Sequence, residues 1–151
     1  MPAYKLSEKG KAELKKTWTT TLVLSYIAIA LIFSYSLLYT GRTMQDVAIF
    51  SVVVVALIAS FIFGRKKYFA GVDNTEVTID DDQVNMKALS QEGVNASYAE
   101  IKEIKQGKMG IELLIKGKRS IFIMNKFERF DEIEAAITLK VNNRLLQPTA
   151  G

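Results

Sequence analysis

The sequence predicts an α+β protein: a two-helix transmembrane hairpin followed by a small antiparallel β-barrel or sandwich that a C-terminal amphipathic helix caps. Three observations support this prediction. Two long apolar runs come early in the chain, an alternating apolar pattern begins near Thr75, and a helical pattern returns after Asn125. A hydrophobic period of two indicates strands, and spacings of three and four indicate a helix. We therefore expect two parts, residues 1–67 and residues 68–151.

The first apolar run extends from Trp18 to Tyr39 and contains no acidic or basic residue. At about 1.5 Å per residue, about 22 residues give roughly 33 Å, which matches the hydrocarbon thickness of a bilayer. The aromatic residues at its two ends favour the membrane interface. We expect a transmembrane helix over about 18–39. A cleavable signal peptide, the alternative, has a shorter apolar stretch.

The second apolar run is shorter, from Val47 to Phe63, and it includes four consecutive valines. A buried strand or core helix is the alternative. However, each Leu, Ile, Val or Phe contributes about −0.3 to −0.6 kcal/mol to membrane insertion, and the run ends at a basic segment, Arg65–Lys67. We expect a second span over about 45–63, joined to the first by a tight hairpin at 40–46.

Basic residues determine the predicted orientation. Only Arg42 lies between the two runs, so the positive-inside rule places both termini in the cytoplasm and makes this a multi-pass protein of the cytoplasmic (inner) membrane. The residues before Trp18 are expected to be a solvated basic tail, with a short surface helix as the alternative. The predicted membrane-interface anchors are Trp18, Tyr39, Arg65, Lys66 and Lys67.

Composition excludes several classes of chemistry. The 151-residue chain has no Cys and no His, which removes disulfides, thiolate nucleophiles, Cys/His zinc sites and imidazole bases. Its net charge of +4 is unevenly distributed. Nine basic and three acidic residues precede Tyr68, whereas eleven basic and thirteen acidic residues follow from Tyr68 onward. A slightly negative domain lacks the electrostatic basis of nucleic-acid binding, so we expect no nucleic-acid partner.

Six short antiparallel strands are expected between Thr75 and Asn125. Turns are expected at Asp80–Asp82, at Gly107–Gly110 and at Gly117, because Asp and Gly favour turns. Between these turns, apolar residues alternate with polar ones over about 76–79, 84–88 and 94–98, and a fourth strand is expected at about 101–105. Over 111–115 and 121–123, every second residue is apolar and these residues share one face of the strand.

The C-terminal segment has a helical period. Asn125 is expected to cap the helix, with Glu128 three residues later as the capping-box partner. One face of this helix is apolar and is expected to close the open side or end of the sheet. Its residues are Phe127, Phe130, Ile133, Ile137 and Val141.

Two segments also carry a family likeness. Residues 98–104 read YAEIKEI and residues 121–127 read IFIMNKF. Together with the two apolar runs and the final helix, these segments make the chain from Trp18 to Val141 resemble the YcxB-like family of small bacterial membrane proteins. The resemblance implies a PH-like fold, a bent antiparallel sheet capped by one C-terminal helix. It implies no enzyme and supplies no catalytic residues.

The acidic run Asp80–Asp82, near Asp73, has carboxylate oxygens of the kind that bind Ca²⁺ or Mg²⁺. It lacks the alternating ligand spacing and the distal Glu of an EF-hand loop. Nothing in the pattern indicates a cleft that would raise carboxyl pKa values for acid–base catalysis. We interpret the run as a solvated hairpin turn, and we expect no metal site, no catalytic residue and no cofactor.

Basic residues around one strand turn are the candidate contact surface for an anionic lipid headgroup or a protein partner. Each basic residue near an anionic surface contributes about 1 kcal/mol, so three or four would orient a domain on its membrane. An ordinary solvated hairpin is the alternative. The candidate residues are Lys116, Lys118, Arg119, Lys102 and Lys105.

Two hypotheses of function follow. The first is a membrane-anchored, non-enzymatic module that uses a β-edge or the basic hairpin to bind a protein or lipid partner at the cytoplasmic face. The second is an accessory or assembly subunit of a larger membrane complex, with its spans as the interface. A transporter or channel is less favoured, because the spans contain no ionisable group to line a path unless they form a homo-oligomer.

Overall fold

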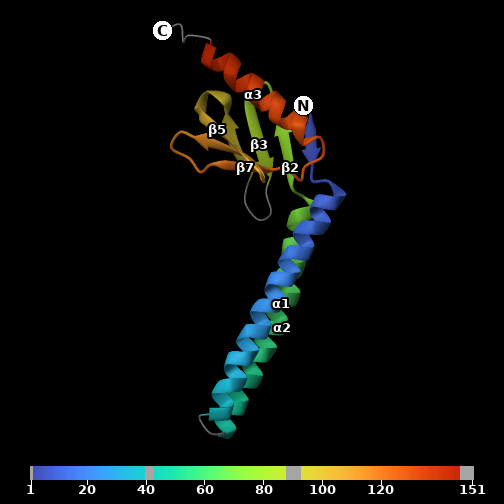
Figure 1. Cartoon of the computed structure of the whole chain (residues 1–151), viewed down its shortest axis with the longest axis vertical. Helices are drawn as coiled ribbons and strands as arrows, with labels where there is room; N and C mark the ends of the chain where they lie inside the picture. Colours follow the sequence, from blue (N-terminus) through green and yellow to red (C-terminus); the bar gives the residue numbers. More distant parts are fainter. Residues whose placement is uncertain (1, 40–42, 88–92, 147–151) are drawn as a thin grey trace. The chain divides into compact units, whose positions relative to one another are not determined.

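The computed structural model describes residues 2–39, 43–87 and 93–146, and the chain divides into two compact units. The helical unit is Glu13–Phe69, and the sheet unit combines residues 1–12 with residues 70–151. Two long apolar helices, two small antiparallel sheets and a C-terminal helix confirm the α+β class (Figure 1).

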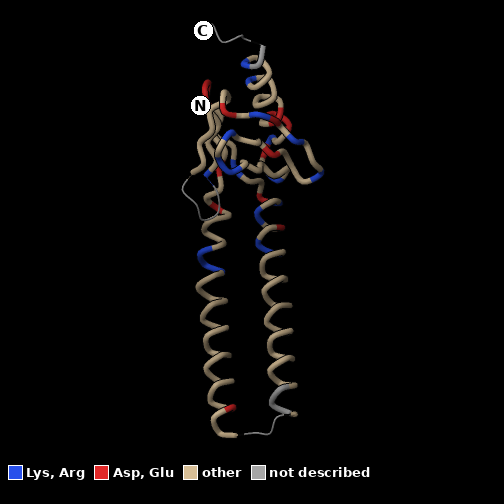
Figure 2. Tube along the Cα trace, turned by 90° about the vertical axis from the view of Figure 1, so that its left-hand side faces the viewer, with Lys and Arg blue, Asp and Glu red and all other residues tan. Residues whose placement is uncertain are grey.

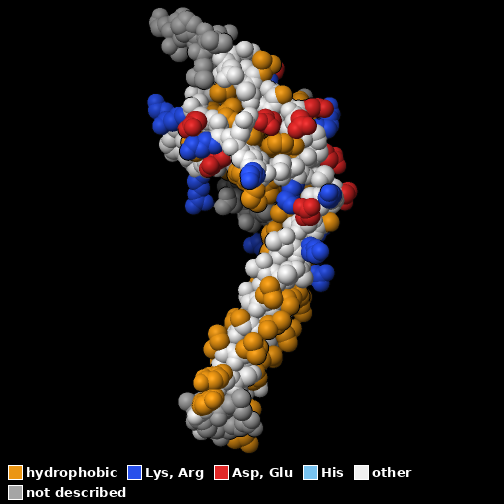
Figure 3. Space-filling model, viewed as in Figure 1, with side chains coloured by type: hydrophobic (Ala, Val, Ile, Leu, Met, Phe, Trp, Pro, Cys, Tyr) orange, Lys and Arg blue, Asp and Glu red, His pale blue; other side chains and the backbone are white. Residues whose placement is uncertain are grey.

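The helical unit contains most of two long helices, α1 (Glu8–Tyr39) and α2 (Met44–Asp73). The first residues of α1 and the last residues of α2 belong to the sheet unit. Both helices are long and apolar enough to cross a membrane, by length and composition. Hydrophobic side chains cover their surface (Figure 3), and the middle of each helix carries neither acidic nor basic residues (Figure 2). Both helices extend beyond the apolar runs into polar flanks. Most of the expected hairpin turn, residues 40–42, lies outside the described residues.

Seven strands form the two sheets of the sheet unit. The four-stranded sheet has the order β1–β2–β3–β4, and the three-stranded sheet has the order β5–β6–β7. A short 3₁₀ turn, η1 (Tyr98–Glu100), joins the sheets, and α3 (Phe130–Leu146) follows them. The strands are β1 (Ala3–Lys5), β2 (Glu76–Ile79), β3 (Gln83–Lys87), β4 (Val94–Ser97), β5 (Ile101–Gly107), β6 (Gly110–Ile115) and β7 (Ile121–Met124).

The predicted strands and turns are confirmed to within one or two residues from β2 to β7. Alternation explains this accuracy, because in β6 every second residue, from Ile111 to Ile115, is buried. The turn before β6 depends on Gly110, whose φ is 144° and whose hypothetical Cβ would lie 2.1 Å from the carbonyl oxygen of Ile123. Within the described residues the two sheets stay separate, so the barrel form is not seen.

One apolar core lies among the two sheets and α3. Its α3 residues are the buried Ile133, Ile137 and Val141, which confirms the predicted apolar face. α3 lies against η1 and β2 and closes one side of the sheets (Figure 1). Burying each such side chain contributes about 1.5–3 kcal/mol relative to leaving it exposed.

The N-terminal segment is part of the core, so the expectation of a solvated tail is wrong. β1 pairs antiparallel with β2, with Tyr4 opposite Val77. Leu6 is completely buried and forms an isolated bridge with Phe127. Residues 1–12 therefore belong to the sheet unit together with residues 70–151. The helical hairpin is an insertion between two neighbouring strands.

The start of the C-terminal helix also differs from the prediction. Asn125 does not cap it, because residues 126–128 continue to pair with the N-terminal segment. The Ser7 amide donates to the Lys126 carbonyl at 2.9 Å, and the Glu128 amide donates to the Lys5 carbonyl at 2.9 Å. A positive φ of 56° at Arg129 then ends the extended stretch. α3 therefore begins at Phe130 rather than at Asn125.

Candidate functional site

The structure gathers four of the five predicted basic residues at one end of the three-stranded sheet. Ile101 pairs with Ile115, and the Lys116 amide donates to the Glu100 carbonyl at 2.9 Å. The start of β5 and the end of β6 therefore meet, which brings Lys102 to the same end as the β6–β7 turn. We call this surface the basic end; it comprises Lys102, Lys116, Lys118 and Arg119, all exposed.

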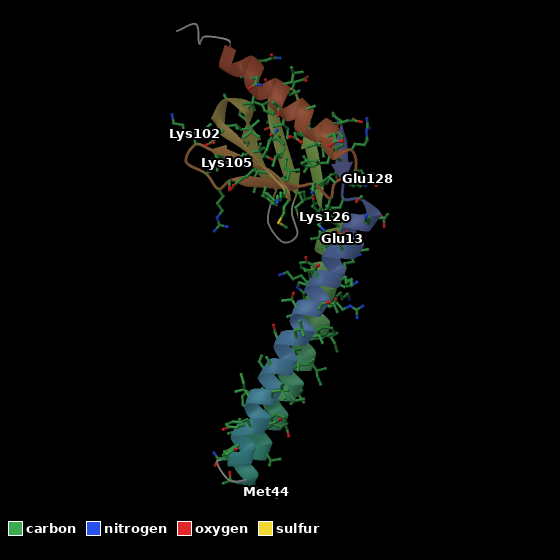
Figure 4. All side chains as sticks on the ribbon, viewed as in Figure 1. Glu13, Met44, Lys102, Lys105, Lys126 and Glu128 are labelled. Carbon is green, nitrogen blue, oxygen red and sulfur yellow. The ribbon has the colours of Figure 1, made fainter. Side chains whose placement is uncertain are left out.

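Lys105 lies apart from the basic end. It is opposite Glu112 in the middle of the β5–β6 pair, on the outer face of the sheet. Lys102 and Lys105 both come from β5, and Figure 4 labels them. Lys105 follows Lys102 by three residues, and at about 3.3 Å per residue an extended strand carries it roughly 10 Å further along β5.

Glu100 is the acidic partner of the basic end. The Lys118 ammonium donates to both carboxylate oxygens of Glu100 at 2.9 Å. This hydrogen bond, together with one from the Ser97 amide, holds the pKa of the Glu100 carboxyl below its ordinary value. Glu100 also completes a capping box with the Ser97 hydroxyl at η1. The basic end is thus anchored to the start of β5 by one exposed ion pair.

The acidic turn Asp80–Asp82 is held by basic residues of α3. The Lys140 ammonium donates to the Asp80 carbonyl at 2.7 Å and to a carboxylate oxygen of Asp81 at 3.0 Å. Arg144 pairs with Asp82. Lys140 lowers the pKa of the Asp81 carboxyl. These contacts tie the turn to α3, which the sequence did not predict.

Tyr98 is the buried centre of this arrangement. Its hydroxyl donates to the Asp80 carbonyl at 3.2 Å, and the Lys140 ammonium lies 5.7 Å from the centre of its ring. Burial, with a smaller contribution from the charges of Asp80 and Asp81, raises the pKa of Tyr98 to about 12. The phenol therefore stays protonated at neutral pH and pins the β2–β3 turn to η1.

The acidic residues do not assemble into a metal-binding group in the part of the chain that the structure describes. Asp73 ends α2 before β2 begins, whereas the Asp80–Asp82 turn follows the end of β2. The four residues of β2 therefore lie between Asp73 and the Asp80–Asp82 turn, whose carboxylates were grouped above as a candidate metal site.

The predicted membrane-interface anchors lie at two ends of the helical unit. Trp18 stacks on Tyr68 with ring centres 5.0 Å apart and planes at 10°. Nearby, the Arg65 guanidinium lies 5.0 Å from the centre of the Phe69 ring. Tyr39, at the other end of α1, contacts Tyr35 and is 75% exposed. Trp18 also stacks on Phe61 of the second apolar run. Its partners Tyr68 and Phe69 were not singled out from the sequence, because they lie beyond that run.

An apolar groove of about 410 Å³ runs along the helical unit between α1 and α2. Tyr26 and Phe61 contribute rings to it, 6.1 Å apart between their centres. Its other lining residues are aliphatic: Val23, Ile27, Ala30, Val54, Leu57 and Ile58.

The contacts of the N-terminal strand with the rest of the sheet unit were not predicted from the sequence. Tyr4 and Leu6 alternate with Ala3 and Lys5, which is a strand signal, but it spans too few residues to stand out among lysines. The lysines were explained by membrane orientation alone. The N-terminal segment packs closely against the chain near Lys126: a Cβ added at Gly10 would lie 2.6 Å from the Lys126 carbonyl oxygen.

Comparison with known proteins gives no relative: the chain matches no protein-family model, no curated protein and no solved structure.

Proposed function

We propose that the protein is a membrane-anchored, non-enzymatic module whose sheet unit binds an anionic partner at the cytoplasmic face of a bacterial inner membrane. The observation that carries this proposal is the presence of two specialised surfaces in one chain. The helical unit exposes apolar side chains along two helices of spanning length, and the sheet unit exposes the basic end.

A PH-like fold is part of the proposal. Four antiparallel strands, a second sheet of three and one C-terminal helix in that chain order support it. The likeness of residues 98–104 and 121–127 to the YcxB-like family points in the same direction, and we propose kinship with that family. In such a fold the loops and sheet edges, rather than a catalytic pocket, serve as contact surfaces.

The pairing of β1 with β2 supports the proposed membrane orientation. Lys5 lies opposite Glu76, so the chain enters and leaves the helical hairpin at neighbouring strands of one sheet. Both ends of the hairpin must then lie on the same side of any membrane that it crosses. Basic residues flank these two ends, and the positive-inside rule makes that side the cytoplasm.

Anionic lipid headgroups are the partner that the basic end favours, because each nearby basic residue contributes about 1 kcal/mol at an anionic membrane surface. The test uses the full chain in vesicles of phosphatidylcholine with or without phosphatidylglycerol, and measures hydrogen exchange of the β6–β7 turn. We expect slower exchange with phosphatidylglycerol, and loss of that slowing in a K116E/R119E variant.

A matched control is Lys108→Glu, which removes a lysine from the turn at the opposite end of β6 and should keep the lipid effect. Equal exchange in both vesicle types would reject lipid binding and leave a protein partner as the candidate for the basic end.

The alternative function is an accessory or assembly subunit, and the apolar groove between α1 and α2 is the observation that favours it. The test is cross-linking and capture from native membranes, comparing the full chain with a version whose two spans are replaced by unrelated ones. If the same partners are captured by both, the sheet unit recognises them; if they are captured only by the original chain, the spans are the interface.

A further inference from the structure

The free edge of β5 from Glu103 to Gln106 lies outside the basic end, to which the proposed function assigns the partner. β5 is the outermost strand of the β5–β6–β7 sheet, and at seven residues it is the longest strand described. An edge strand presents unpaired backbone N–H and C=O groups that another strand can bind. Glu103, Lys105 and Gln106 are all exposed along it.

The register of the β5–β6 hairpin shows which backbone groups point to the free edge. A two-residue turn, Lys108–Met109, connects the paired Gly107 and Gly110. In such a hairpin the closing pair is hydrogen-bonded, and hydrogen-bonded and non-hydrogen-bonded pairs then alternate. The backbone groups of Lys105 and Glu103 therefore face β6, whereas those of Ile104 and Gln106 face outward.

We infer that this edge pairs with the β5 edge of a second copy of the chain, in an antiparallel arrangement centred on Ile104. Three registers bring the outward-facing groups of Ile104 and Gln106 together, and they are centred on residues 104, 105 and 106. The register centred on 105 places Lys105 against Lys105, and the register centred on 106 places Lys105 opposite Gly107 and Glu103 opposite Met109, without an opposite charge. Only the register centred on Ile104 places each Glu103 opposite a Lys105 of the other copy.

Charge complementarity is therefore the argument for a second copy rather than another peptide. The Glu103–Lys105 contacts fall on non-hydrogen-bonded positions, where side chains approach most closely. Cross-strand pairs of opposite charge stabilise a sheet, and like charges at such positions destabilise it. Lys105 would lie between Glu112 of its own chain and Glu103 of the other, extending one row of alternating charge across both sheets.

Space for the second strand is present beside β5. The Gln106 side chain donates a hydrogen bond to Glu134 of α3 at 2.5 Å. Beside this contact lies a groove of about 470 Å³, which is also lined by Asp131, Ala135, Thr138, Leu139 and Asn142. Leu139 is 62% exposed there, and the hydroxyl of Thr138 is buried without a hydrogen-bond partner among the described residues. Apart from the side-chain contact between Gln106 and Glu134, this groove stays open beside the end of β5.

A strand pair alone buries less area than the roughly 1,200 Å² of a stable interface in solution. Anchoring in a membrane raises the effective concentration of the two copies, as any tether does. In this respect the inference rests on the proposed anchoring, which alkaline extraction of the same membranes tests separately.

The experiment uses the full chain in its membrane, and the absence of native cysteine makes single-cysteine variants clean. Ile104→Cys places a thiol at the two-fold axis, where opposed Cα atoms of a hydrogen-bonded pair are about 5.5 Å apart, within disulfide range. We expect oxidation to link I104C chains at least about tenfold more than F122C chains, whose thiol lies on β7, the other edge of the same sheet.

Charge exchange supplies the decisive comparison in the I104C background. E103K alone and K105E alone should each lower the linked fraction by about tenfold, because two attractions become two repulsions at once. Two differently tagged chains, one with E103K and one with K105E, should form mixed dimers at the original level, which also shows that both variants fold. Equal linking of I104C and F122C, or no recovery in the mixture, would overturn the inference.

Discussion

The two units place their large apolar side chains in opposite positions. In the sheet unit Leu6, Val77 and Ile123 are completely buried, whereas in the helical unit Leu24, Leu31 and Val52 are 62%, 66% and 68% exposed. Exposing a large apolar patch to water has a high free-energy cost. The sheet unit is therefore organised for water, and the exposed helical surface supports lipid as the surroundings of the helical unit.

Two leucines test this contrast with the largest expected effect. Leu6→Ala should lower the free energy of unfolding of the sheet unit by about 2–5 kcal/mol, because it leaves a cavity in the core. Leu24→Ala should change it by less than about 0.5 kcal/mol, because that side chain is exposed on a helix and Ala favours helices. Denaturant unfolding of the full chain in detergent, followed by near-ultraviolet circular dichroism, measures both. Equal effects would contradict the contrast.

Arginine substitutions in α2 and in α3 test whether lipid surrounds the helical unit. Val55→Arg, in the middle of α2 where the side chain is 66% exposed, should cost about 2.5–3.5 kcal/mol of membrane insertion. Asn143→Arg, exposed on α3, should cost less than about 0.5 kcal/mol. The measurement is the fraction of chain that stays in membranes after alkaline extraction. Full retention of V55R would show that α2 is not surrounded by lipid.

The smallest expected effect is on the pKa of Glu100, which belongs to the charged surface of the sheet unit. The middle of the two long helices has no such charged groups. Glu100 has a folded-state pKa below its ordinary value of 4.5, so its ion pair with Lys118 stabilises the fold above about pH 4.5 and this contribution is lost as the pH falls. Lys118→Ala should raise the pKa of Glu100 toward the ordinary value in a carboxyl NMR titration. Lys108→Ala, at the other end of β6, should leave it unchanged.

Most of the fold was predictable because its signals are local. Strands β2, β3, β4 and β6 have apolar residues at every second position, β5 and β7 are bounded by turn residues, and α3 shows a clear apolar face. β1 was missed because Ala3–Lys5 is too short to show a period and its partner, Glu76–Thr78, lies across the whole hairpin. The start of α3 was misplaced for the same reason, since the strand-like state of residues 126–128 depends on that distant N-terminal segment.

The sequence predicted which basic residues form the candidate site, but not how they are arranged or which acidic residues they contact. The lysines of the β6–β7 turn are adjacent in sequence, so they stay together in the fold. Lys105 is close to Lys102 in sequence but lies opposite Glu112, because an extended strand separates residues three apart by roughly 10 Å. The partners of the acidic turn, Lys140 and Arg144, were missed because they come from α3, about 60 residues further along the chain.

The insertion of the hairpin between β1 and β2 also sets the order of events during synthesis. Lys5 is made early, but Glu76, opposite it, follows about 70 residues later, and the Lys126 carbonyl that receives the Ser7 amide comes later still. At about 5–20 residues per second, the first strand waits for several seconds with Tyr4 and Leu6 uncovered. A nascent chain that stalls before β2 therefore leaves β1 without its strand partner, and one that stalls before Phe127 leaves Leu6 without its bridge.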